Sequence, residues 1–184
     1  MGMEIQQFKE LEIFKNFEST FKETSCDSDS GERAYMTESG IPVINFDKVK
    51  NYYIRDMGLP ETPCSSDALY MSEDNVYFIE FKNGKMSNKE GFMVQKKIYD
   101  SLLIFNDIVE QNISFCREYV NFILVYNESK NSKEEIANHF FKKAKQHRVR
   151  FNLEKFEKLY FKKVFTYTEN EFQQEFLNSL IESA

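Results

Sequence analysis

Three charged residues stand out where the chain otherwise has the pattern of an apolar strand: Asp67, Glu80 and Lys82. Glu80 and Lys82 belong to the run VYFIEFK (76–82), whose aromatic and β-branched residues are typical of a strand. Because side chains alternate along a strand, Glu80 and Lys82 share one face with apolar neighbours. Burying them there is costly unless they pair with each other or with a metal ion.

The segment that begins at Asp67 also has strand character and predicts a β-hairpin with the strand that contains Glu80. If residues 73–74 form a two-residue turn, Asp67 lies directly opposite Glu80. If the turn moves to 74–75, Asp67 lies opposite Lys82, on the same face. Only a three-residue loop would separate them, because a slip of one residue moves side chains to the other face.

Two neighbouring carboxylates repel each other when ionised, unless a cation lies between them. Their oxygens suit Mg²⁺ or Mn²⁺, because an ion of this kind is held by one or two carboxylates and keeps several waters. Such an ion lowers the pKa of a bound water and stabilises charge on a phosphoryl group, and a nearby lysine can help to deprotonate that water. Asp67, Glu80 and Lys82 therefore predict a metal-dependent phosphodiester hydrolase. The simpler alternative is a solvated strand end with an ordinary Glu80–Lys82 ion pair.

The surrounding elements predict one α/β domain over residues 1–184, of the α+β type with a mixed sheet. Apolar spacing of three and four favours a helix over 3–23, residues 24–40 read as a loop, and 41–59 leave helix and strand open. The later elements are a helix over 89–110, a strand over 119–126, a helix over 133–147, a strand near 159–166 and a capped helix near 169–182. This order favours a central mixed β-sheet with a hairpin, flanked by helices on both faces.

Asp67 followed by Glu-Phe-Lys at 80–82 resembles the D…(D/E)XK signature of the PD-(D/E)XK, or restriction endonuclease-like, nuclease superfamily. The next helix carries Gln95 and Tyr99, which are similar to the QxxxY motif of the exonuclease and RecB-like branch. The resemblance covers about residues 64–126. It implies a restriction endonuclease-like core and a nuclease activity on DNA or RNA.

The same resemblance implies roles for individual residues. The metal ligands would be Asp67, Glu80 and the backbone carbonyl of Phe81, with Mg²⁺ or Mn²⁺ as the cofactor. Gln95 and Tyr99 would support the active site and its substrate. Each also has a plainer interpretation, since Gln95 fits an ordinary polar position beside a helix stripe and Tyr99 fits the core.

The sequence departs from the family pattern at Ser66, where the motif's name has proline. The family's first helix often donates another glutamate toward the metal. Glu4, Glu10, Glu12 and Glu18 are available for that role, and the sequence does not choose among them.

The net charge of −6 argues against a general affinity for nucleic acid. The charge is unevenly spread, because residues 1–75 sum to −8 and residues 133–163 to +6. The basic block reads as a solvated face or as a set of phosphate contacts. Beside the motif, Lys85, Lys96 and Lys97 are candidate nucleic-acid-binding residues, although Lys96 and Lys97 also fit a solvent-facing helix surface.

A second function class competes with the nuclease. It is a catalytically inactive module on the same fold, either an immunity or antitoxin-like protein or a subunit of a complex. The acidic balance favours it, since an acidic surface suits a basic protein partner.

The remaining features concern location. No apolar run approaches the about 18 residues that a membrane span needs, and MGMEIQQFKELEIF lacks the pattern of a signal peptide. Cys26, Cys64 and Cys116 form no CxxC pair, so we expect free thiols and no zinc site. A cytoplasmic location is the resulting expectation.

Overall fold

The computed structural model of the chain describes residues 2–27, 33–131 and 149–182. Within them, a mixed six-stranded sheet forms the centre of the molecule. In spatial order its strands are β1 (Glu18–Thr20), β4 (Pro42–Asn45), β5 (Ala68–Met71), β6 (Val76–Lys82), β7 (Val120–Tyr126) and β8 (Lys163–Thr168). Neighbours from β1 to β6 are antiparallel, whereas β6, β7 and β8 run parallel. A separate small pair joins β2 (Cys26–Asp27) to β3 (Ala34–Tyr35).

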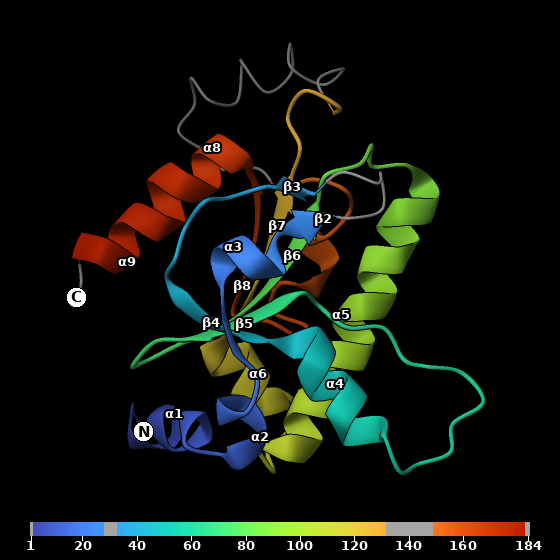
Figure 1. Cartoon of the computed structure of the whole chain (residues 1–184), viewed down its shortest axis with the longest axis vertical. Helices are drawn as coiled ribbons and strands as arrows, with labels where there is room; N and C mark the ends of the chain where they lie inside the picture. The colour runs from blue at the N-terminus through green and yellow to red at the C-terminus, as the bar shows by residue number, and fades with distance from the viewer. Residues whose placement is uncertain (1, 28–32, 132–148, 183–184) are drawn as a thin grey trace.

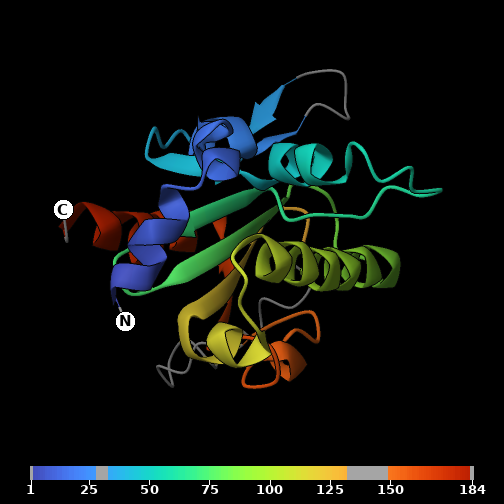
Figure 2. The same ribbon diagram turned by 90° about the horizontal axis from the view of Figure 1, so that it is seen from below.

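Helices cover both faces of this sheet. The described helical segments are α1 (Gly2–Lys9), α2 (Glu12–Lys15), α3 (Phe21–Thr24), α4 (Phe46–Ile54), α5 (Asn88–Ile108), α6 (Ile113–Tyr119), the 3₁₀ turn η2 (Glu154–Phe156), α8 (Glu169–Glu171), the π-helical η3 (Phe172–Leu177) and α9 (Asn178–Glu182). Apolar residues of α1, α2, α4, α5 and α6 pack in one core, and those of α3 and η3 in the other. Figure 1 shows α5 and the α8–α9 region on opposite sides of the sheet, and Figure 2 shows α4 and α5 side by side. The predicted mixed sheet with flanking helices is confirmed.

The alternation along β6 accounts for the two cores. Val76 and Phe78 pack on the side of α5, whereas Ile79 and Phe81 pack on the side of η3. Both faces of β6 are therefore covered by packed side chains, and β7 is buried at every position. Parallel strands covered by helices on both faces have this nearly continuous apolar character.

The hairpin adopts the first of the two predicted registers. The amide of Ser72 donates to the carbonyl of Asn75 at 2.8 Å, so the turn consists of residues 73–74. The same register places Asp67, which precedes β5, level with Glu80 in β6. A local turn therefore fixes which acidic residues meet.

The prediction of one helix over residues 3–23 was wrong. Leu11 is extended (φ −61°, ψ 131°) and interrupts the helical run before α2, and β1 then pairs with β4 at the sheet edge. The apolar residues keep their role, because Phe8, Phe14 and Phe21 are all in the core. A spacing of three and four selects an inward face, but it does not guarantee an unbroken helix.

Other boundaries were partly right. Residues 24–40 are mostly loop but contain β2 and β3, and the ambiguous stretch 41–59 holds both β4 and α4. The helix expected over 133–147 lies outside the described residues. The sequence did not predict α6, and the last strand ends at Thr168, where the expected capping box with Glu171 is present. No helix in the described ranges combines the length and apolar character needed to cross a membrane.

Candidate functional site

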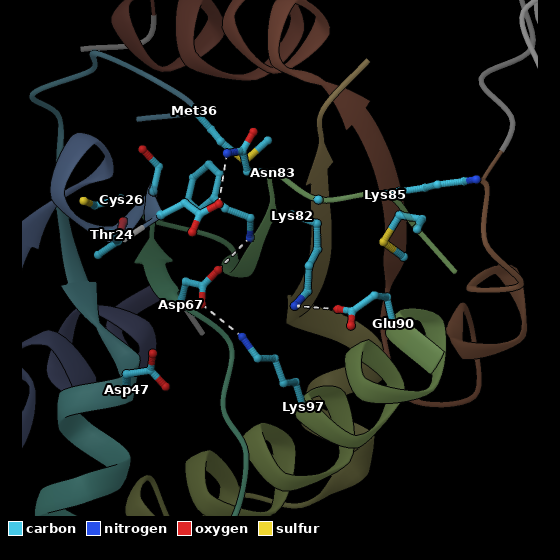
Figure 3. Close-up of a pocket in the computed structure, with 15 residues that line it drawn as sticks. Thr24, Cys26, Met36, Asp47, Asp67, Lys82, Asn83, Lys85, Glu90 and Lys97 are labelled. Carbon is cyan, nitrogen blue, oxygen red and sulfur yellow. Dashed lines mark hydrogen bonds and ion pairs between the residues drawn. The ribbon is translucent and has the colours of Figure 1, made fainter. Parts of the chain in front are cut away.

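A cavity of about 470 Å³ opens at the end of β6, between α5 and the segment that contains α3 and β2. Its walls come from α3 and β2, the start of α4, the residue before β5, the end of β6 and the first half of α5. Figure 3 shows Asp67, Lys82 and Lys97 directed into this space. Segments far apart in the sequence thus meet around the predicted Asp–Glu–Lys motif.

The Lys97 ammonium joins the two predicted carboxylates. Its Nζ lies 3.1 Å from Asp67 Oδ1 and 2.7 and 2.9 Å from the two carboxylate oxygens of Glu80. The second oxygen of Asp67, Oδ2, accepts a hydrogen bond from the amide of Phe81 at 2.7 Å. Asp67 and Glu80 therefore converge on one cation.

Lys82 lies beside this cluster, on the face that strand alternation predicts. Its Nζ is 3.4 Å from Glu80 Oε1. It is also 3.4 Å from Glu90 Oε2 of α5, the contact drawn in Figure 3. The Lys82 side chain is 20% exposed, so it reaches both the buried carboxylate and the cavity. Lysine is suited to such a place, because its ammonium is a compact charge on a flexible stem.

Helix α5 holds the motif in place through the segment that leads into β5. The Ser101 hydroxyl accepts a hydrogen bond from the amide of Ser66 at 2.8 Å, and Asp100 accepts one from the amide of Cys64 at 2.8 Å. These bonds tie the backbone just before Asp67 to the helix that carries Lys97. The relative position of the acid and the ammonium is thus set by backbone contacts.

The rim of the cavity is tied together by asparagine side chains after β6 and β7. The Asn83 amide donates to Asp27 Oδ2 at 2.9 Å and accepts from the Asn127 amide at 2.9 Å. Asn131 accepts from the amide of Met86 at 2.8 Å. These bonds fix the loop 83–86 as a wall of the cavity.

Burial dominates the electrostatics of the acidic pair. It raises the pKa of Glu80 to about 8, with repulsion from Asp67 adding to the shift, while Lys97 and Lys82 oppose it. Burial also raises the pKa of Asp67, against the attraction of Lys97 and the hydrogen bond from Phe81. Burial alone would lower the pKa of Lys97, but the nearby carboxylates of Glu80 and Asp67 raise it. The ammonium therefore keeps its charge at neutral pH.

The residues at this position could hold a Mg²⁺-type ion only through a minimal set of two carboxylates. Across the described ranges, no three His, Cys, Asp or Glu residues gather closely enough to hold a metal ion. Asp67 and Glu80 nevertheless provide two convergent carboxylates, and Mg²⁺ needs no more than this when waters and substrate phosphate complete its shell. Lys97 is a cation already seated between these oxygens, so the position suits positive charge.

The structure adds three acidic residues that the sequence did not single out, because Asp27, Asp47 and Glu90 all line the cavity. Asp47, in the first turn of α4, lines the cavity and accepts a hydrogen bond from the Ser65 hydroxyl. Glu10 instead pairs with Lys15, and Glu18 borders a different cavity on the far end of β1. The added acidic residues thus come from β2, α4 and α5 rather than from the predicted first helix.

Gln95 and Tyr99 do not line the cavity. Gln95 Oε1 accepts a hydrogen bond from Lys155 Nζ at 2.7 Å. The Tyr99 ring packs edge-to-face on Phe156 and Tyr160, with centroids 5.5 and 5.7 Å away. Both side chains therefore join α5 to the segment around η2, which leaves their proposed catalytic role without geometric support.

The three candidate nucleic-acid-binding lysines occupy different surroundings. Lys85 lines the cavity, with its side chain directed away from Asp67 in Figure 3, and Lys96 does not line it. Lys97 contacts the carboxylates of Asp67 and Glu80. The sequence had predicted for it either a phosphate contact or a solvent-facing position. The available signal was helical spacing, because Lys97 shares the sheet-facing side of α5 with Val94 and Ser101, which are buried.

Comparisons with known proteins find no match for this chain among protein-family models, curated proteins or solved structures.

Proposed function

We propose that this protein is a metal-dependent phosphodiester hydrolase, a nuclease that acts on DNA or RNA. The observation that carries the proposal is the convergence of Asp67 and Glu80 on a single cation position, with Lys82 beside it. A buried pair of carboxylates with a neighbouring ammonium at the wall of a cavity suits phosphoryl chemistry better than it suits stability, since buried ion pairs contribute little net stability. A restriction endonuclease-like core belongs to the same proposal, and the motif-bearing hairpin followed by α5 and β7 supports it.

Asp67 and Glu80 would hold the Mg²⁺ or Mn²⁺ ion, and the Phe81 carbonyl is the third ligand that the family resemblance implies. Such an ion supplies a water of lowered pKa and neutralises charge on the phosphate. Lys82 has the position to donate a hydrogen bond to the attacking water and to stabilise the hydroxide that forms. Lys85, on the rim, is available to a phosphate of the substrate.

The central test is replacement of Lys82 by methionine, which keeps the length of the side chain and removes its charge. We expect Mg²⁺- or Mn²⁺-dependent cleavage of single- or double-stranded DNA or RNA to fall by about 10²-fold or more, because a positioned proton-transfer group contributes on this scale. Lys89→Met is the matched control, since Lys89 is exposed at the start of α5. Gel assays of cleavage and thermal melts of each variant provide the measurements.

If the wild-type protein cleaves none of these substrates, with free ends or closed circles, in either metal, the nuclease function is wrong. If Lys82→Met and Lys89→Met lose activity equally, Lys82 has no special part in the reaction.

A binding module without activity is the second candidate, and one observation favours it. Lys97 already occupies the two carboxylates, so the cluster is satisfied without a metal ion. The segment 1–75, with a charge of −8, would then offer a surface to a basic protein partner. Calorimetry that detects no divalent-ion binding, together with recovery of a basic protein on the immobilised chain, supports this candidate over the nuclease.

A further inference from the structure

We propose that Lys97 is an internal counter-ion that excludes the metal, so that a divalent ion binds Asp67 and Glu80 only when the Lys97 ammonium leaves them. This inference rests on the part of the proposed function that makes these two carboxylates the metal ligands. It adds a regulation of metal binding that the Asp–Glu–Lys motif does not contain, because Lys97 lies outside that motif.

The first argument is contact geometry. Lys97 Nζ is within 3.1 Å of an oxygen of each carboxylate and touches both oxygens of Glu80. A metal ion bridging the same oxygens would lie within about 2.1 Å of each of them. Two cations cannot share that volume, so occupancy by the ammonium and by the ion are mutually exclusive.

The second argument is access. The Glu80 side chain is 0% exposed and does not border the cavity, whereas the side chains of Asp67 and Lys97 are 17% and 19% exposed. Lys97 therefore lies between the cavity and the carboxylate of Glu80. An ion that enters from the cavity reaches Glu80 only after the ammonium has moved.

Charge compensation points the same way. Lys82 is shared between Glu80 and Glu90, with 3.4 Å to each, whereas Lys97 contacts both Asp67 and Glu80. When the Lys97 ammonium moves into the cavity, these two carboxylates lose that positive charge, which is costly unless another cation replaces it. A divalent ion is such a replacement, and the flexible stem of Lys97 permits the movement.

The experiment is a calorimetric titration of Mn²⁺ into wild-type protein and Lys97→Met at constant pH, without nucleic acid. We expect Lys97→Met to bind Mn²⁺ at least about tenfold more tightly, because a unit positive charge in contact with the ligands has been removed. Lys97→Arg, which keeps the charge, should bind as weakly as the wild type. Lys96→Met is the matched control, because the neighbouring lysine makes no contact with either carboxylate in the described structure.

Thermal melting gives a second readout. In EDTA, Lys97→Met should melt below the wild type, because its two buried carboxylates have lost their main cation. Adding Mn²⁺ should raise the melting temperature of Lys97→Met by more than that of the wild type. If Lys97→Met does not fold in EDTA, Lys97→Gln serves in the same titration, since its amide can still donate a hydrogen bond to a carboxylate.

Equal Mn²⁺ affinity in folded wild type, Lys97→Met and Lys97→Gln overturns the inference. Tight binding by Lys97→Met from a protein that never cleaves nucleic acid supports the inference and defeats the nuclease proposal. Cleavage by the wild type, together with a Mn²⁺ affinity that loss of Lys97 does not change, supports the nuclease proposal and overturns the inference. The two proposals therefore fail separately.

Discussion

Glu80 is the residue whose surroundings are hardest to reconcile with an ordinary structural role. Its side chain is fully buried, faces another acidic residue, and relies on Lys97 and Lys82 for compensation. A protein that needed only stability would gain from an apolar residue at this position, because a buried ionic group seldom gives a net benefit. A buried Glu80 with this cost in stability is what the proposed chemical role would account for.

The raised pKa of Glu80 gives a pH-dependent stability. The folded state keeps a proton on Glu80 up to about pH 8, whereas the unfolded chain loses it near the ordinary pKa of 4.5. In metal-free protein the free energy of unfolding should therefore fall as the pH rises through this window, at no more than about 1.4 kcal/mol per pH unit. Urea unfolding of wild type and Glu80→Gln in EDTA at pH 6 and pH 9 measures the effect. The difference between the two proteins should change with pH, and parallel curves would contradict the assignment.

At the scale of elements, two sides of α5 make different contacts. Its sheet-facing side carries Lys97 and holds the backbone before Asp67 through Ser101. A second side places Gln95 and Tyr99 against the segment around η2. The contacts with the Asp67 segment and the packing against the segment around η2 thus depend on different residues of one helix.

This division makes a prediction about the QxxxY-like pair. Tyr99→Ala should lower the free energy of unfolding by about 1–2 kcal/mol, through loss of its ring contacts with Phe156 and Tyr160. Gln95→Ala should change stability little, since its hydrogen bond to Lys155 is exposed. Neither change should reduce cleavage per folded molecule. Loss of activity at unchanged stability, seen in urea unfolding and cleavage assays, would restore the catalytic role that the family resemblance implies.

At the scale of the whole molecule, the charge distribution is unusual for a partner of nucleic acid. The net charge is −6, and the cavity is lined by Lys82, Lys85 and Lys97 together with several acidic side chains. At this cavity, attraction to a polyanion therefore depends on three lysines. Affinity that depends on so few contacts should respond weakly to salt.

The salt dependence of binding tests this picture. With about three lysine–phosphate contacts, the slope of log K against log salt should lie near −2 to −3, since each neutralised phosphate contributes about −0.7 to −0.9. Fluorescence polarisation of a labelled oligonucleotide with the wild-type protein in EDTA, at several salt concentrations, measures the slope without metal-dependent cleavage. A slope of about −5 or steeper would show that the basic block over residues 133–163 also contacts phosphate.

Much of the site followed from the sequence because it depends on local rules. Alternation along β6 placed Glu80 and Lys82 on one face, and the two-residue turn at 73–74 placed Asp67 level with Glu80. The strand β7 followed from its continuous apolar run, since only a doubly covered strand tolerates it. Neighbouring residues alone determine such features.

Tertiary structure decided the rest, because the deciding partners are distant in the sequence. The segment 18–20 became a strand by pairing with β4, despite its helical apolar spacing. Tyr99 turned toward Phe156 and Tyr160, which no local pattern could have indicated. The sequence by itself determined that Asp67, Glu80 and Lys82 share a face. Only the packing of α5 on the sheet decided that the Lys97 ammonium lies between the two carboxylates, because Lys97 is distant from both of them in the sequence.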